Sequence, residues 1–220
     1  VLVFVCLVQE VRRSIVRICF DWKKKEGYKV LVIPGIILSI DVNGNATIAA
    51  NATFFIGKKF RCVVNFPNSI GYEDGIELSY DSVINGDNFS TFTLRPSGDG
   101  YIKPVKFEVQ PVHIGDEVSA FVFPRESFVT PTGYCGGVIL ERNERIFIHD
   151  CDMHEYGYLG SPLFNLRGHL VGITFLDKGH LQAWTVLELQ DVVLKNTKST
   201  LVSNGEPMET PPIAEAQVEE

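Results

Sequence analysis

Short apolar segments separated by glycine, proline and asparagine run through most of this chain. The segments are rich in β-branched and aromatic residues, which favour strands, and the breaks between them are typical turn positions. No stretch of the first hundred residues keeps the period of a helix, so an all-β barrel or sandwich is expected there. The predicted strands of the first half cover residues 11–20, 29–33, 36–40, 46–48, 59–64, 76–80, 89–94 and 103–110. Turns are predicted at Pro34–Gly35 and at Asn43–Gly44, a strong hairpin signal.

The second half repeats this pattern and then changes its period. Strands are predicted over residues 113–124, 128–140 and 145–150, and a hairpin is predicted over residues 162–173. Val186, Leu189, Val192 and Val193 share one helix face, which predicts an amphipathic helix over residues 181–196.

The two ends of the chain differ from its body. The apolar residues 1–8 are too few to span a bilayer, and we expect them to pack on the fold as a buried strand or helix. After Ser199 the composition shifts to Pro, Glu, Ser and Asn, which predicts a flexible acidic tail over residues 199–220.

Composition excludes some partners. A chain of 220 residues with 45% hydrophobic and 21% charged residues can bury a substantial core, as one domain or two small barrels. The net charge is −7, and the acidic excess lies in the tail. Because the body is then close to neutral, we expect neither nucleic acid nor a membrane surface as a partner.

The five cysteines are widely spaced and form no Cys-x-x-Cys pair, which indicates a reducing intracellular compartment. Three Asn-x-Ser/Thr sequons, at Asn45, Asn51 and Asn88, leave secretion open. The run from His149 to Glu155 is dense in potential metal ligands, but zinc needs four of them in a tetrahedron and no second cluster completes the set. We therefore expect a structural loop there, with no metal and no other cofactor.

Two segments resemble trypsin-like serine proteases, nearest to the HtrA/Deg branch. Residues 157–173 read G-Y-L-G-S-P-L-F-N-L-R-G-H-L-V-G-I, where the family has G-N-S-G-G-P-L-x-N-x-x-G-x-V-G-I. Residues 113–124 resemble the strand that opens the family's second barrel. The resemblance implies two six-stranded antiparallel β-barrels with a C-terminal α-helix. It divides the chain into an N-terminal extension (1–13), a first barrel (14–110), a second barrel with the helix (111–198) and the tail (199–220). HtrA-like proteases usually carry a PDZ domain, for which this chain leaves no room.

The resemblance also indicates where the family's catalytic triad would lie. It places Thr53 at the histidine, Asn88 at the aspartate, with Asp87 adjacent in the register, and Leu159 at the nucleophilic serine. The oxyanion turn would be formed by Gly157, Leu159, Gly160 and Ser161. Independently of this match, all five histidines lie at position 113 or beyond, whereas the fold takes its general base from the first barrel. Since acyl transfer needs a hydroxyl activated by an imidazole, an ordinary serine-protease mechanism is not expected.

Two other residues are alternative nucleophiles. Ser161 lies two positions after Leu159, and Cys135 lies in a segment that resembles the G-x-C-G-G motif of picornaviral chymotrypsin-fold cysteine proteases. The leading hypothesis is a non-catalytic trypsin-like domain, a pseudoprotease, that binds an extended peptide or a partner protein. The alternative is an active protease that uses Cys135 or Ser161, and a third reading is a structural module of a longer polypeptide. Whether the chain is an enzyme stays open, with the balance toward a binding protein.

Overall fold

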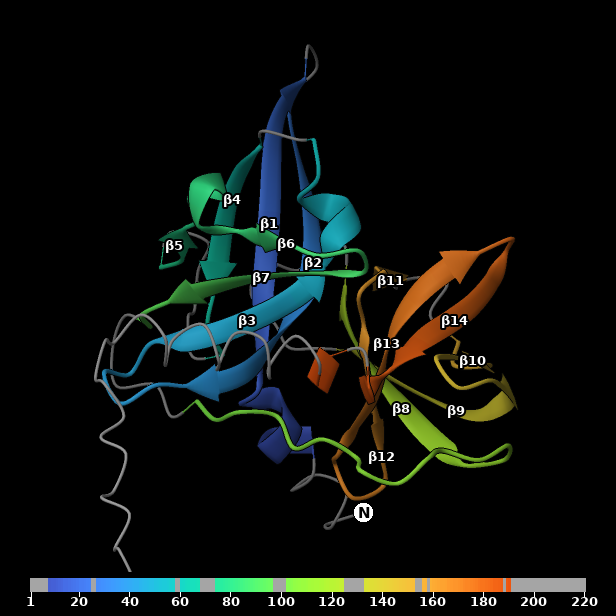
Figure 1. Ribbon diagram of the computed structural model, residues 1–220. Coiled ribbons are helices and arrows are strands. Elements are labelled where there is room, and N and C mark those ends of the chain that lie inside the picture. Colours follow the sequence, from blue (N-terminus) through green and yellow to red (C-terminus); the bar gives the residue numbers. More distant parts are fainter. Residues whose placement is uncertain are drawn as a thin grey trace, which may run out of the picture.

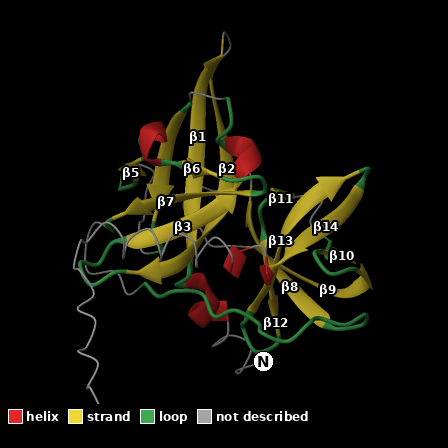
Figure 2. Ribbon diagram, viewed as in Figure 1, coloured by secondary structure: helices red, strands yellow, loops and turns green. Residues whose placement is uncertain are grey.

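Two seven-stranded sheets, lying side by side, build the protein (Figure 1 and Figure 2). The computed structural model describes residues 8–24, 27–57, 60–67, 74–96, 102–124, 133–152, 156–157, 159–187 and 189–190. The all-β prediction is confirmed. No helix within these ranges is long and apolar enough to cross a membrane.

The first sheet is formed by the first half of the chain, with the strand order β5-β4-β1-β2-β3-β7-β6. Among the described residues no pairing joins its two ends, so this sheet forms a half-barrel, which corresponds to the first barrel expected from the sequence. Two short 3-10 helices, η1 (Ala52–Phe54) and η2 (Tyr80–Ser82), interrupt its connections. The strands are β1 (Ile15–Lys24), β2 (Gly27–Ile40), β3 (Ala46–Asn51), β4 (Arg61–Asn65), β5 (Ile76–Glu77), β6 (Ile84–Asn85) and β7 (Phe89–Leu94).

The second sheet closes on itself. Its strand order is β11-β8-β12-β13-β14-β10-β9, and an additional pairing of β8 with β9 joins six of the strands into a barrel, with β11 paired to Phe123 and Pro124 at the end of β8. The strands are β8 (Glu117–Pro124), β9 (Gly133–Arg142), β10 (Ile146–His149), β11 (Tyr156–Gly157), β12 (Pro162–Asn165), β13 (Leu170–Asp177) and β14 (His180–Thr185). The hairpin predicted over residues 162–173 is confirmed as β12 and the first half of β13.

Three apolar clusters form the core, and one of them joins the two sheets. One cluster fills the first sheet around Phe20 and Phe92, and another fills the second barrel around Phe147. The third combines residues of both sheets, among them Phe89 from β7 and Phe164 from β12. Because burial of apolar area stabilises contacts without regard to direction, this shared cluster fixes how the sheets sit against each other.

The turn predicted at Pro34–Gly35 is wrong, because β2 runs straight through it. Pro34 and Gly35 pair with Arg17 and Val16 of β1. β2 pairs with β3 only from Ile36 onward, so the missing N–H of the proline costs no ladder bond to β3. A Cβ atom at Gly35 would lie 2.7 Å from Ile18 Cδ1 and 2.8 Å from Val16 Cγ2, so the glycine is needed for close packing and not for a turn.

The helix predicted over residues 181–196 begins later than expected. Residues 181–185 belong to β14, which pairs with both β13 and β10. The two-residue turn before it has positive φ at Lys178 (49°) and Gly179 (83°), the geometry that closes a tight hairpin. The described residues 186–187 and 189–190 are helical, and residues 191–196 lie outside the described ranges.

Several other predicted strands differ from the structure, and the one predicted over residues 113–124 starts at Glu117. The segment 103–110 crosses from the first sheet to the second as an extended linker, and its one isolated bridge joins Phe107 to Leu170. The strand predicted over 11–20 starts at Ile15, because residues 8–12 are helical. The strand predicted over 76–80 ends at Glu77. In each case a tertiary contact or a local turn prevails over intrinsic strand propensity.

Candidate functional site

The segment matched to the protease histidine is the η1 turn at the end of β3. The Asn51 side chain caps this turn, and its Oδ1 accepts a hydrogen bond from the Thr53 N–H over 2.9 Å. Asn51 is buried, whereas Thr53 is exposed. The Ala52 N–H donates to the Asn88 carbonyl oxygen over 3.0 Å. The backbone segments of Thr53 and Asn88 are therefore neighbours.

The glycine turn of the second barrel lies against the same segment. A Cβ atom at Gly160 would lie 3.4 Å from Asn51 Cβ, and Gly160 itself has φ +83°, which favours glycine. Leu159 packs against the apolar cluster of the first sheet, which includes Phe54 and Phe55. The structure thus brings the segments of Thr53, Asn88 and Leu159 together where the two sheets meet. Gly157 lies in β11, where it pairs with Phe123.

The side chains matched to the triad are not those of a serine-protease triad. Leu159 offers only hydrocarbon, and Thr53 and Asn88 supply neither a general base nor a carboxylate to orient one. The imidazole of His149 belongs to β10 and is only 3% exposed inside the second barrel. Its Nε2 lies 3.4 Å from Thr174 Oγ1, and burial lowers its pKa from 6.5 to about 4.

The two alternative nucleophiles are poorly placed for attack. Ser161 is 0% exposed, and its carbonyl oxygen accepts a hydrogen bond from the Thr174 N–H over 2.9 Å. Cys135 lies within β9, opposite Ala120 of β8, and is half-buried. Burial, together with the charge of Asp152, raises the pKa of its thiol. A cysteine nucleophile needs the opposite shift, because the thiolate is the reactive form.

One edge of β13 next to the glycine turn is covered by no described strand, and we call it the open edge of β13. The Gly160 N–H donates to the Thr174 carbonyl oxygen over 2.8 Å, and the Thr174 N–H donates back to Ser161. Successive residues of a strand direct their N–H and C=O groups to opposite edges, so residues two apart share an edge. The N–H and C=O groups of Leu176 therefore point to the same edge of β13 as those of Thr174. The pairing of β12 with β13 ends at Ile173, and no described strand covers Leu176 there. The Leu176 side chain is 43% exposed.

An aromatic group lies beside this edge and connects the two sheets. The rings of Phe175 and Trp184 are stacked with centroids 4.0 Å apart, and Trp184 meets Phe89 edge-on at 5.3 Å. Phe89 follows Asn88 directly, so the aromatic group adjoins the junction described above. The sequence did not identify this arrangement, because Trp184 was assigned to a helix.

Solved structures that are similar to this chain include three of one protease. The active form of the Rv3671c protease from M. tuberculosis is 20% identical at a TM-score of 0.63, with 86% of this chain and 83% of that chain covered. Its inactive form is 19% identical at a TM-score of 0.62, with 88% and 94% covered. A serine-to-alanine mutant of the inactive form, from strain H37Rv, is 19% identical at a TM-score of 0.62, with 88% and 92% covered. The chain has the trypsin-like double-barrel fold.

Sequence comparison adds nothing to this fold assignment. No family model matches the chain, and no curated protein matches it. At the identities given above, structural similarity establishes the trypsin-like fold and not the activity.

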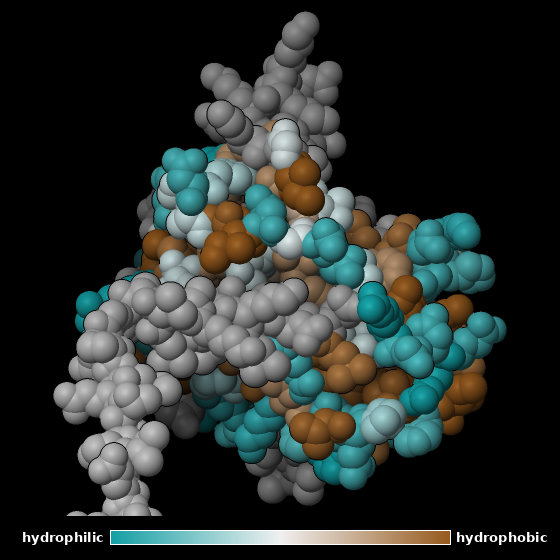
Figure 3. All heavy atoms as spheres, viewed as in Figure 1, coloured by the Kyte–Doolittle hydropathy of each residue, from teal (hydrophilic) through white to brown (hydrophobic). Residues whose placement is uncertain are grey.

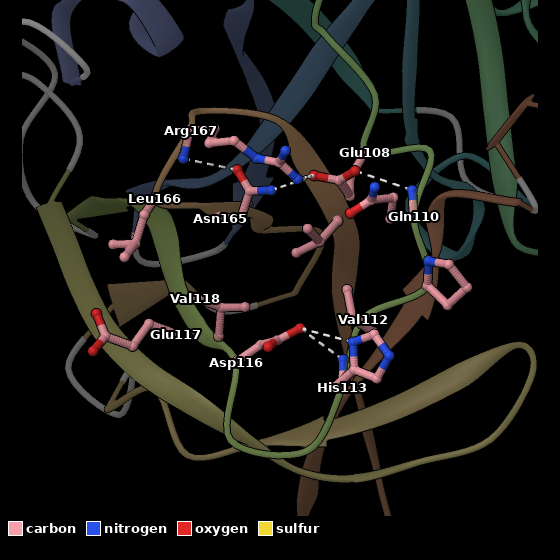
Figure 4. Close-up of a pocket in the computed structure, with 12 residues that line it drawn as sticks. Glu108, Gln110, Val112, His113, Asp116, Glu117, Val118, Asn165, Leu166 and Arg167 are labelled. Carbon is pink, nitrogen blue, oxygen red and sulfur yellow. Dashed lines mark hydrogen bonds and ion pairs between the residues drawn. The ribbon is translucent and has the colours of Figure 1, made fainter.

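A buried carboxylate holds the linker against the second barrel of this trypsin-like fold. Glu108 is 5% exposed, and its Oε1 accepts a hydrogen bond from the Gln110 N–H over 3.0 Å. Its Oε2 accepts from Asn165 Nδ2 over 2.5 Å and forms an ion pair with Arg167 (Figure 4). The Gln110 N–H is the largest of the influences that lower the pKa of Glu108, and Arg167 and Asn165 add to it. No sequence pattern indicated this cluster, because Glu108 lies in a segment that was predicted as a plain strand.

The run of potential metal ligands is only partly described. His149 points into the barrel, whereas Asp150 accepts a hydrogen bond from the Val138 N–H over 2.6 Å. Within the described ranges no group of three or more His, Cys, Asp or Glu side chains could hold a metal ion, and residues 153–155 lie outside them.

Proposed function

We propose that this domain is a non-catalytic member of the trypsin-like fold that binds an extended peptide or a segment of a partner protein. The observation that carries the proposal is the position of Leu159. Its side chain packs against the first sheet beside the segments of Thr53 and Asn88, where the protease match would put the attacking hydroxyl. Relation to the HtrA/Deg branch stays a prediction from the sequence motifs.

The open edge of β13 supplies a physical mode of binding. An extended peptide can add to a free strand edge by backbone hydrogen bonds, while pockets beside the edge select its side chains. Leu176 offers an N–H and a C=O for this purpose, and the stack of Phe175 and Trp184 offers an apolar surface next to them. Such binding needs no reactive group.

A proline at position 176 should weaken peptide binding roughly tenfold, because it removes the N–H that points to the open edge, and a tenfold change corresponds to about 1.4 kcal/mol. Leu176 forms no β13–β14 ladder bond, since its polar groups point away from β14, so the sheet should survive Leu176→Pro. Peptides selected from a display library of short linear sequences would be measured by fluorescence anisotropy against wild type, Leu176→Pro and the matched control Leu176→Ala.

The control should bind like wild type, because alanine keeps the N–H. N-methylation of alternate peptide bonds in the selected peptide should weaken binding in the same way and does not depend on the folding of a variant. Selection of no peptide, or equal binding by the proline and alanine variants together with tolerance of N-methylation, contradicts binding at this edge.

The alternative function is an active protease that uses Cys135 or Ser161, and the fold it shares with the Rv3671c protease favours it. Labelling the native protein with a fluorophosphonate and with iodoacetamide separates the two functions. We expect no stoichiometric labelling that depends on the native fold, because Ser161 is buried and the pKa of Cys135 is raised. Labelling of one of these residues that is lost on denaturation would establish the protease instead.

A further inference from the structure

Two adjacent pockets flank the linker on the second barrel, away from the glycine turn. Their volumes are about 290 Å³ and about 280 Å³, and they share Glu108, Gln110, Pro111, Val112 and Val171 as walls. We name the pair the linker groove; Figure 4 shows the larger, more polar pocket. We propose that the linker groove binds a second kind of peptide segment, one in which a lysine or arginine stands two residues from a large apolar residue. This inference does not depend on binding at the β13 edge.

The walls of the groove are fixed before any ligand arrives. The Glu108 N–H donates to the Leu170 carbonyl oxygen over 2.9 Å, and the Glu108 carboxylate is held by Asn165 and Arg167. Arg142 of β9 donates a hydrogen bond to the Val112 carbonyl oxygen. Walls held in this way lose little conformational entropy on binding, which favours affinity.

Apolar side chains line the groove and remain exposed to solvent. Val109 is 82% exposed and Leu187 is 59% exposed, and both line the smaller pocket. Leu166 lines the larger pocket, where the buried Val118 and Val171 also contribute. Figure 3 shows hydrophobic patches set among hydrophilic side chains over this part of the second sheet. Exposed apolar groups that gather at pockets mark interaction sites more often than scattered ones do.

Charge selects the partner. Among the described lining residues, four carboxylates outnumber two arginines. Arg167 is paired with Glu108, whereas Arg142 donates to the Val112 carbonyl oxygen and keeps its charge. The larger pocket is lined by the carboxylates of Glu108, Asp116 and Glu117 against one arginine, so its lining has an excess of negative charge when the His113 imidazole, 3.7 Å from Asp116 Oδ2, is neutral. A cationic side chain complements this lining, whereas an acidic one is repelled. The four carboxylates are those of Glu108, Asp116, Glu117 and Glu144.

Pocket size points to single side chains as ligands. Each volume lies at or below the lower limit of about 300 Å³ for small-molecule sites. The stem of a lysine or arginine can lie on Val118 and Val171 with its charged head at Asp116, since such side chains bury their stems and keep the charge in water. Residues i and i+2 of an extended peptide point to the same side about 7 Å apart, so the next such side chain can enter the adjacent apolar pocket.

The test uses fluorescein-labelled peptides that contain Lys-Ser-Leu, and matched peptides with Glu-Ser-Leu or Lys-Ser-Ser. Anisotropy titrations should show that each matched peptide binds at least about fivefold more weakly than Lys-Ser-Leu, and that added salt weakens the Lys-Ser-Leu complex. The double variant Asp116→Asn, Glu117→Gln should bind Lys-Ser-Leu about fivefold to tenfold more weakly. Asparagine keeps an acceptor for the His113 N–H, which donates to Asp116 Oδ2 over 2.7 Å, so the loop should stay folded. The matched control Asp81→Asn lies in η2, on the first sheet, and should bind like wild type.

Three outcomes overturn the linker groove as a site. They are no saturable binding of Lys-Ser-Leu up to about 1 mM, equal affinity for Glu-Ser-Leu, and unchanged affinity of the double variant. A fourth contradicting outcome would come from sedimentation velocity. A dimer of this chain that dissociates in the variant Leu187→Ser would show that the groove is a contact between two copies. If Leu176→Pro abolishes Lys-Ser-Leu binding and the groove variant does not, the β13 edge is the peptide site and the groove is not.

Discussion

Lowering the pH from about 7.5 to about 4 should remove about 3 kcal/mol from the free energy of unfolding through the single residue His149. Burial inside the second barrel lowers the pKa of His149 from 6.5 to about 4, and the nearby Asp150 only partly opposes this. Between pH 6.5 and about pH 4, His149 therefore binds a proton in the unfolded chain but not in the folded one. The stabilisation is complete above pH 6.5 and is lost as the pH falls toward 4.

The surroundings of His149 give a structural reason for so large an effect. Its Nε2 lies 3.4 Å from Thr174 Oγ1, and its buried Nδ1 has no hydrogen-bond partner among the described residues. The ring also lies 6.3 Å from that of Phe147, within the apolar cluster of the barrel. A second proton on this ring would place a charge among apolar groups with one acceptor at most, which is costly.

The measurement is urea unfolding of wild type and His149→Phe at a series of pH values between about 4 and about 7.5. The difference in unfolding free energy between the two proteins should change by about 3 kcal/mol across this range. The pKa of Asp41 and the pKa of Glu108 are also lowered by hydrogen bonds, so these carboxylates add acid sensitivity of the same sign. They are present in both proteins and cancel in the difference.

The matched control is Ile18→Val in the first sheet, a buried substitution that removes no titratable group and should lower the unfolding free energy by the same amount at every pH. Parallel profiles for wild type and His149→Phe would contradict the prediction. Such a result would mean that the imidazole takes up its proton in the folded state as easily as in the unfolded chain.

The elements that local sequence signals specify were predictable. The β12–β13 hairpin is one of them. The Asn165 side chain accepts hydrogen bonds from the N–H groups of Arg167 and His169 and so closes the turn that the sequence predicts. β7, predicted over residues 89–94, is another. β14 was missed because Val186 and Leu189 begin a helical period directly after it, and the pattern was extended backward over Trp184.

The features that depend on contacts between distant segments were not predictable. Pro34–Gly35 has the composition of a turn, and only the packing of Gly35 on Ile18 and Val16 explains why it lies within a strand. The open edge at Leu176 exists because β13 continues past the point where β12 begins, a difference in strand length that no local pattern encodes. Glu108 meets Arg167 only because the linker crosses the second barrel.

The matched triad positions rest on motif similarity, and the structure adds that their segments are neighbours. Thr53 and Asn88 are linked through the Ala52 N–H, and Gly160 approaches Asn51 closely. A restored triad would first need these backbone segments to lie close together. This makes the correspondence of Thr53, Asn88 and Leu159 with a protease triad open to a direct chemical test.

Replacing these residues with a triad, in the variant Thr53→His, Asn88→Asp, Leu159→Ser, should convert an unreactive protein into one that a fluorophosphonate labels at position 159. Removing a triad costs about a million-fold in turnover, so even partial restoration should raise labelling far above that of wild type. The matched control carries Thr53→His and Asn88→Asp with Leu159→Ala, and it should stay unlabelled because it has the imidazole but no hydroxyl.

Loss of the Leu159 side chain from the cluster of the first sheet should cost both variants about 2 kcal/mol or more of stability, so their unfolding midpoints are compared first. Labelling is then carried out at a temperature at which both variants are folded. If the folded triple variant reacts no faster than its alanine control, the three positions do not face one another as a triad, and the match to the protease site is wrong. If it reacts and wild type does not, the fold still holds the geometry for acyl transfer, and the native side chains are what prevent the chemistry.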